Sequence, residues 1–193
     1  MRSSKQRIFE AARILFDRDG VSGISMRRIA QAVGLTPMAI YRHYAGKEAL
    51  LDALMRDGFQ AWEARAQAVE APDPMLWLER FFAAFLDFAL HEPRRYDAAF
   101  LLPAAKARRY PDDFAAGRSP AINLVYARVE AAKGAGLIGE APAAEIALAL
   151  SALAQGLVSM YRAGRFASEA GFRTAYESLM RHYLMSFQER PKS

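Results

Sequence analysis

The 193-residue chain contains no cysteine, which excludes disulfides, thiolate metal sites and a cysteine nucleophile, and which fits a cytoplasmic protein. It has only three histidines, and His43, His91 and His182 fall on separate predicted helices. The HExxH, GxSxG and glycine-rich phosphate-loop motifs are all missing. An enzyme is therefore the less favoured class of protein, and we expect no catalytic residue, metal site or cofactor.

Long hydrophobic runs are missing too. The longest weakly polar run, 146–161, has 16 residues and is interrupted by two serines, a glutamine and a glycine. A membrane span needs about 20 mostly apolar residues. The N-terminus is polar and basic without a following apolar segment, which is not the pattern of a secretory signal. We therefore expect a buried helix at 146–161 and a cytoplasmic protein that does not enter a membrane.

Acidic residues are scarce in the first quarter of the chain. Residues 1–47 carry nine basic and three acidic side chains, whereas the other 146 residues carry 17 basic and 18 acidic ones. A positive field confined to one segment is typical of a DNA-binding head on a near-neutral body. Apolar residues make up 53% of the chain, which indicates a folded protein rather than a disordered one.

Residues 25–47, which read SMRRIAQAVGLTPMAIYRHYAGK, contain two helical patterns. Met26, Ile29 and Val33 form an apolar stripe on a short helix, for which Ser25 is the expected N-cap and Gly34 the end. Such helix pairs with a glycine turn are common in all-α proteins, so periodicity alone does not establish DNA binding. The positive charge of this segment favours a helix-turn-helix.

A second short helix is predicted after the glycine turn. Thr36 is its expected N-cap, Pro37 occupies its first position, and Ile40 and Tyr44 recur with helical spacing. If these last two face inward, the outward face holds Met38, Ala39, Arg42 and His43, with Tyr41 at its edge. This face has the composition of a recognition helix, which lies in the major groove of DNA.

The segments RRIAQAVGL, IYRHY and GKEALLDAL, within 23–54, resemble the N-terminal domain of the tetracycline-repressor (TetR) family of bacterial transcription regulators. The resemblance implies that the chain contacts DNA bases through Thr36, Pro37, Met38 and His43. It implies phosphate contacts for Arg27, Tyr41 and Lys47, with Ser25 as a further candidate, and either role for Arg42. Ala45 and Gly46 depart from the family pattern, which commonly has a serine there. The alternative for Lys47 is that it is an ordinary solvent-exposed lysine without a phosphate contact.

The remaining sequence predicts an all-α protein of about nine helices. Apolar spacing and breaker residues place helices at 5–18, 47–69, 74–91, 94–102, 120–133, 143–163 and 169–188, besides the two above. Residues 103–120 are the least regular. The proline pair at 71–74 marks the main boundary. We therefore predict a DNA-binding domain at 1–47, a linker helix at 47–69, and a helical ligand-binding and dimerisation domain at 70–193.

Two surfaces are predicted in this second domain. The resemblance implies a ligand pocket, for which the candidate lining residues are Trp62, Phe81, Phe85, Phe88, Phe100, Tyr126 and Leu157. Aromatic stripes of this kind also form ordinary cores, and that alternative stays open. Broad apolar stripes on the last two helices predict a dimer interface made of Leu150, Leu153, Leu157, Tyr161, Phe172, Tyr176, Leu179 and Tyr183.

These expectations combine into one functional hypothesis. The chain is expected to be a transcriptional repressor that binds a pseudo-palindromic, double-stranded DNA operator as a homodimer. A small apolar or aromatic effector is expected to release it, as the family resemblance implies. The alternative that keeps DNA binding is a protein without a ligand, either a constitutive repressor or an architectural protein held by phosphates.

Overall fold

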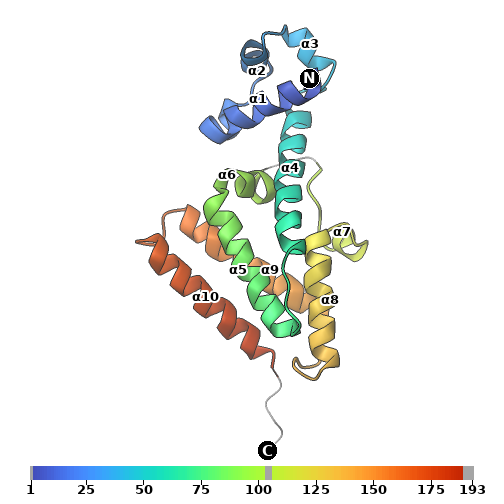
Figure 1. The fold of residues 1–193 in the computed structure, drawn as a ribbon, viewed down its shortest axis with the longest axis vertical. Helices are drawn as coiled ribbons and strands as arrows, with labels where there is room; N and C mark the ends of the chain where they lie inside the picture. Colours follow the sequence, from blue (N-terminus) through green and yellow to red (C-terminus); the bar gives the residue numbers. More distant parts are fainter. Residues whose placement is uncertain (1, 103–105, 189–193) are drawn as a thin grey trace, which may run out of the picture. The chain divides into compact units, whose positions relative to one another are not determined.

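The computed structural model describes residues 2–102 and 106–188, and across these residues the regular structure is entirely helical (Figure 1). The all-α prediction is thereby confirmed. Residues 103–105 of the region predicted to be irregular lie outside the described residues. The elements in order are α1 Ser4–Asp19, η1 Gly20–Gly23, α2 Met26–Val33, α3 Pro37–Tyr41, α4 Lys47–Gln67, α5 Pro74–His91, α6 Pro93–Tyr96, the π-helical η2 Asp97–Leu101, α7 Asp112–Ala115, α8 Pro120–Gly134, α9 Ala143–Arg162 and α10 Glu169–Ser186.

Contacts divide the chain into two compact units. The first consists of Met1–Ala61 and Glu92–Ala107, and the second of Trp62–His91 and Arg108–Ser193. Helix α4 therefore contributes residues to both units. The sequence prediction divides the chain once, at residue 70. The contacts divide it differently, because they also group residues 92–107 with the first unit. The whole net charge of +5 lies in the first unit, because the second has equal numbers of basic and acidic side chains.

The core of the first unit is the predicted three-helix core, with additions from two later segments. The six side chains expected in it are all at most 9% exposed, namely Phe16, Ile24, Ile29, Val33, Ile40 and Tyr44. Leu50, Leu51 and Leu54 of α4 belong to the same cluster, as do Ala98 and Leu102 from the η2 segment. A head with so few core residues of its own gains buried apolar area from these additions.

Gly58 marks a close approach of two helices inside the first unit. A Cβ atom at this position would lie 2.5 Å from the carbonyl oxygen of Arg95 and 3.0 Å from the backbone nitrogen of Ala99. The α6–η2 segment therefore packs against α4 at backbone distance. The side chain of Arg95 also lies 3.5 Å from the carboxylate of Asp57 on the same α4 helix.

Helix α5 is the centre of the second unit, where it packs against α8, α9 and α10 (Figure 1). Eight of its side chains are buried, from Trp77 to Ala89, because the helix is apolar nearly all round. The Trp77 indole N–H donates to the Val69 carbonyl oxygen at 2.8 Å, and the Tyr176 hydroxyl donates to the Phe82 carbonyl oxygen at 3.0 Å. The two polar atoms are thus satisfied within the apolar core.

Helix α9 is long and apolar enough to cross a membrane by length and composition alone. Its buried residues, among them Ile146, Leu150 and Leu157, pack inside the second unit. This is the arrangement of a core helix in a folded domain, which passes the same length and composition test. The expectation of a buried helix at 146–161 agrees with that placement.

Candidate DNA-binding surface

Helix α2 is built as its sequence predicts. The Ser25 hydroxyl accepts a hydrogen bond from the Arg28 backbone N–H at 3.2 Å, which caps the first turn. Ile29 and Val33 are buried in the core of the first unit. Gly34 ends the helix with φ +67°, a left-handed conformation that favours glycine. The turn into α3 is therefore fixed by local backbone geometry.

Helix α3 presents the predicted outward face. Thr36 caps it by accepting from the Ala39 backbone N–H at 3.3 Å, and Pro37 occupies its first position. Ile40 is fully buried, whereas Met38 is 70% exposed and Tyr41 is 49% exposed. The helix ends at Tyr41, earlier than the sequence pattern indicated. One further turn follows, in which the backbone N–H groups of residues 43 and 44 both donate to the residue 40 carbonyl oxygen.

The nine predicted DNA-binding residues lie in or beside this helix pair. Ser25 is half-buried, and the other eight are exposed, namely Arg27, Thr36, Pro37, Met38, Tyr41, Arg42, His43 and Lys47. Arg27 and Arg42 form no ion pair with another described residue. The Lys47 ammonium donates to the Val21 carbonyl oxygen at 3.0 Å, so it joins the start of α4 to η1. Its other two protons stay available to an anion.

Asp19 organises the cations at the edge of this surface, and sequence reasoning did not single it out. Its carboxylate accepts from the guanidinium groups of Arg18 and Arg28. These hydrogen bonds, Arg18 first, hold the pKa of Asp19 well below its usual range. Asp19 thereby ties the end of α1 to α2. An acidic residue directly before Gly20 gives no sequence signal for this role.

Arg7 was also missed by sequence reasoning. Its guanidinium donates to the Val33 carbonyl oxygen at 2.8 Å, across 26 residues of sequence. The bond joins α1 to the end of α2, where the carbonyl lacks a helical partner. Arg7 therefore positions the turn that sets the direction of α3. Only the folded arrangement brings these two groups together.

Comparisons with known proteins agree with this geometry. The family described as bacterial regulatory proteins of the tetR family matches residues 8–54, and the tetracyclin repressor-like C-terminal domain matches residues 78–183. The chain belongs to the TetR family. As a TetR-family protein it is a transcriptional regulator with a DNA-binding helix-turn-helix, which confirms the resemblance found in the sequence. The second match extends that resemblance well beyond the first quarter of the chain.

Individual relatives match over shorter stretches. The HTH-type transcriptional repressor DrrR1 of Streptomyces coeruleorubidus is 43% identical over 49 residues, covering 25% of this chain and 18% of that protein. The uncharacterised HTH-type transcriptional regulator YobS of Bacillus subtilis is 28% identical over 102 residues, covering 51% and 52%. This chain thus spans about half or less of the length of these curated relatives.

A solved structure gives the fold of the whole chain. A protein of unknown function from Rhodococcus sp. RHA1 has a TM-score of 0.80, with 23% sequence identity over 98% of this chain and 97% of that one. At this identity the likeness concerns the fold alone. It shows the same arrangement of helices over nearly the whole sequence.

The predicted ligand-pocket residues are only partly brought together. Trp62 lies with its ring centroid 5.1 Å from those of Phe81 and Phe85 and 5.8 Å from that of Phe88, all within the second unit. Leu157 is buried in the same unit, whereas Tyr126 is 45% exposed on α8. Phe100 belongs to the first unit, where its ring contacts Phe59 and Tyr96. The assignment of a pocket to these residues remains a prediction.

The predicted dimer residues divide into three groups by burial. Leu150, Leu157, Phe172 and Tyr176 are at most 7% exposed within the single chain. They hold α9 and α10 against the rest of the unit and are not accessible to a partner, which corrects the prediction for these four. Leu153 and Tyr161 are half-buried, and the Tyr161 ring stacks on Phe172. Leu179 and Tyr183 are 46% and 37% exposed, so they remain candidates for a dimer interface.

Proposed function

We propose that this TetR-family regulator is a cytoplasmic repressor that binds a pseudo-palindromic operator as a homodimer and is released by a small apolar or aromatic ligand. The observation that carries the proposal is the exposure, on α3 and the residues that flank it, of hydroxyl, imidazole and guanidinium groups together with the apolar side chain of Met38. Such a mixture suits base edges and phosphates at once. The name of the relative DrrR1 as a repressor supports the direction of regulation.

The roles of the exposed residues follow from their chemistry. Met38 offers apolar contact, which suits a thymine methyl group and discriminates little by hydrogen bonding. Hydrogen-bond readout of bases then falls on Thr36, Arg42 and His43, with Pro37 fixing the backbone beside them. Each good base contact contributes about 1–3 kcal/mol of discrimination.

Phosphate contacts are assigned to the surrounding residues. Arg27 lies in the first turn of α2, exposed and without an acidic partner among the described residues. Tyr41 has an exposed hydroxyl, Lys47 begins α4, and Ser25 caps α2. These groups would fix the register of α3 in the major groove without reading sequence.

An exposed stripe on α9 supports a dimer, together with Leu179 and Tyr183 on α10. Leu148, Ala152, Gly156 and Met160 recur every four residues and are all exposed, so they share one face of the helix. Small residues in the middle of such a stripe allow two helix backbones to approach closely. A twofold pair would set two α3 helices about 34–36 Å apart, one turn of DNA.

Substitution of Gly156 tests the dimer. No heavy atom lies within 4 Å of a Cβ placed at Gly156 in the single chain, so Gly156→Arg is accommodated by the subunit. At a helix–helix interface the same side chain would hold the partner away. We expect Gly156→Arg to sediment as a monomer and to lose operator affinity at least about 100-fold, because the two half-sites are no longer bound together.

Gly134→Arg is the matched control. Gly134 is also exposed with no heavy atom within 4 Å of its Cβ position, but it ends α8 and is not part of the α9 stripe. It should remain dimeric and bind operator normally. If Gly156→Arg sediments as a dimer, the α9 stripe is not the interface.

The ligand is proposed to contact the aromatic group around Trp62. Its neighbours Phe81, Phe85 and Phe88 form an apolar, aromatic environment inside the second unit. A ligand releases DNA only if it binds the DNA-free conformation more tightly than the DNA-bound one. Aromatic compounds that quench Trp62 fluorescence should therefore lower operator affinity, and a compound that quenches without this effect would argue against the coupling.

A further inference from the structure

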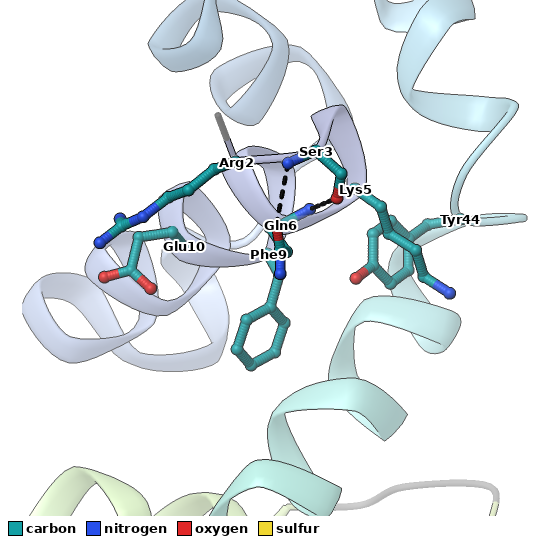
Figure 2. Close-up of a pocket in the computed structure, with 7 residues that line it drawn as sticks. All are labelled: Arg2, Ser3, Lys5, Gln6, Phe9, Glu10 and Tyr44. Atoms are coloured by element: carbon teal, nitrogen blue, oxygen red, sulfur yellow. Dashed lines mark hydrogen bonds between the residues drawn. The ribbon is translucent and has the colours of Figure 1, made fainter.

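An open hollow on the surface of the first unit, called the cavity below, lies between the start of α1 and Tyr44. Its volume is about 400 Å³, within the range of small-molecule sites, and Arg2, Lys5, Phe9 and Glu10 line it together with Tyr44 (Figure 2). All of these residues belong to the same compact unit. The cavity is separate from the outward face of α3 and from the aromatic group around Trp62, so neither proposed role above uses it.

Tyr44 supplies an unused polar group to this cavity. The residue is only 8% exposed, yet its hydroxyl makes no hydrogen bond with any described residue. Figure 2 shows the ring side-on to the cavity, with its hydroxyl directed toward the space beside Phe9. Burial raises the pKa of Tyr44, so the hydroxyl is a hydrogen-bond donor at neutral pH. The hydroxyl oxygen is not among the fully buried polar atoms without a partner, so it reaches the open side of the cavity, where a ligand can accept from it.

The charge around the cavity is positive. Arg2 and Lys5 are exposed at its rim, and the Lys5 ammonium lies 5.9 Å from the Tyr44 ring centroid. Glu10, the acidic residue of the lining, is held by the guanidinium of Arg13, and this hydrogen bond lowers the pKa of Glu10. Its charge is therefore compensated by Arg13. Arg2 also lies beside Glu10 (Figure 2), so Lys5 is the rim cation without an acidic partner among the described residues.

The helix terminus at the rim is already satisfied. The Ser3 hydroxyl accepts from the Gln6 backbone N–H, and the Gln6 side chain accepts from the Ser3 backbone N–H. This capping box leaves the Lys5 ammonium and the Tyr44 hydroxyl as the polar groups that can bind a ligand. The remaining walls are apolar, because the rings of Phe9 and Tyr44 form them.

We propose that this cavity is a second ligand site, for a small aromatic anion such as an aryl carboxylate. The aromatic ring of the ligand would lie against Phe9 and Tyr44. Its carboxylate would accept from the Tyr44 hydroxyl and lie close to the Lys5 cation. The site adds to the proposed function and does not depend on it, since it requires neither the dimer nor the pocket at Trp62.

Titration of the full-length protein with benzoate tests the proposal. In ¹H–¹⁵N NMR spectra, benzoate should shift the amide resonances of Lys5, Phe9 and Tyr44 in a saturable way. Benzamide keeps the ring without the charge, and inorganic phosphate keeps charge without the ring. Both should bind at least about tenfold more weakly than benzoate, because benzamide lacks the charged hydrogen-bond acceptor and phosphate lacks the ring that is buried.

Variants identify the groups that bind. Tyr44→Phe keeps the ring and the core packing but removes the donor, and it should weaken benzoate binding about tenfold. Lys5→Gln should weaken it about threefold, as expected for a solvent-exposed charge. Arg18→Gln removes a cation from the other end of α1 and should leave the benzoate dissociation constant unchanged.

Three results would overturn the proposal. Benzoate shifts confined to residues of the second unit would place the ligand elsewhere. An unchanged dissociation constant in Tyr44→Phe would remove the hydroxyl from the site. Phosphate or benzamide binding as tightly as benzoate would contradict the requirement for a ring and a charge together. None of these outcomes bears on operator binding, so failure here is distinct from failure of the repressor proposal.

Discussion

Replacing Gly58 by alanine should destabilise the first unit, although alanine is the better helix former. Alanine contributes about 1 kcal/mol in a helix interior relative to glycine. Here its Cβ would lie 2.5 Å from the Arg95 carbonyl oxygen and 3.1 Å from the Ala99 Cβ. The nearest atoms belong to backbone, which cannot rotate away, so we expect an overpacking cost of about 3 kcal/mol. The net loss in the free energy of unfolding is about 2 kcal/mol.

The assay is thermal unfolding at one fixed protein concentration. For a chain of this size a loss of 2 kcal/mol lowers Tm by about 4–8 °C. Gly134→Ala is the control, because its Cβ meets no heavy atom within 4 Å, and it should not lower Tm. A Gly58→Ala protein as stable as wild type would refute the reasoning, since α6–η2 could not then pack on α4 at backbone distance.

Three further substitutions follow from the described contacts. Lys47→Gln should weaken binding to all DNA sequences and reduce the slope of log affinity against log salt by about 0.9, whereas an unchanged slope would mean no phosphate contact. Asp19→Asn should lower stability at pH 7. Because the pKa of Asp19 is lowered in the folded protein, its carboxylate stabilises the fold at pH values above its ordinary pKa. The stability difference between Asp19→Asn and wild type should therefore shrink below about pH 4. A stability difference that does not change with pH would exclude the ion pairs with Arg18 and Arg28. Leu150→Ala should lower the free energy of unfolding of the subunit by about 2–5 kcal/mol, because the side chain is fully buried. A variant that weakens the dimer without destabilising the subunit would contradict the burial of Leu150 inside the single chain.

Much of the head could be predicted from the sequence because its signals are local. The N-caps Ser25 and Thr36, the proline at the start of α3 and the glycine turn each act over a few residues. The inward position of Ile40 fixes which side chains face outward. For this reason the exposure of the predicted DNA-binding residues matches the structure, while their contacts with DNA remain predictions.

Other features depend on contacts that no local pattern encodes. Ala98 and Leu102 join the head core from far along the chain, so the first unit is larger than residues 1–47. On α10, one broad apolar stripe contains both Tyr176, which is buried in the chain, and Leu179, which is exposed. Helical spacing shows that both are apolar positions but not which of them the subunit itself covers.

The measurement that tests the central claim most directly is selection of random DNA duplexes by the purified protein, followed by sequencing. The account predicts a pseudo-palindrome with half-sites about one turn of DNA apart, and loss of that motif in the Gly156→Arg protein. Recovery of no preferred sequence at low and moderate salt would contradict a specific dimeric repressor.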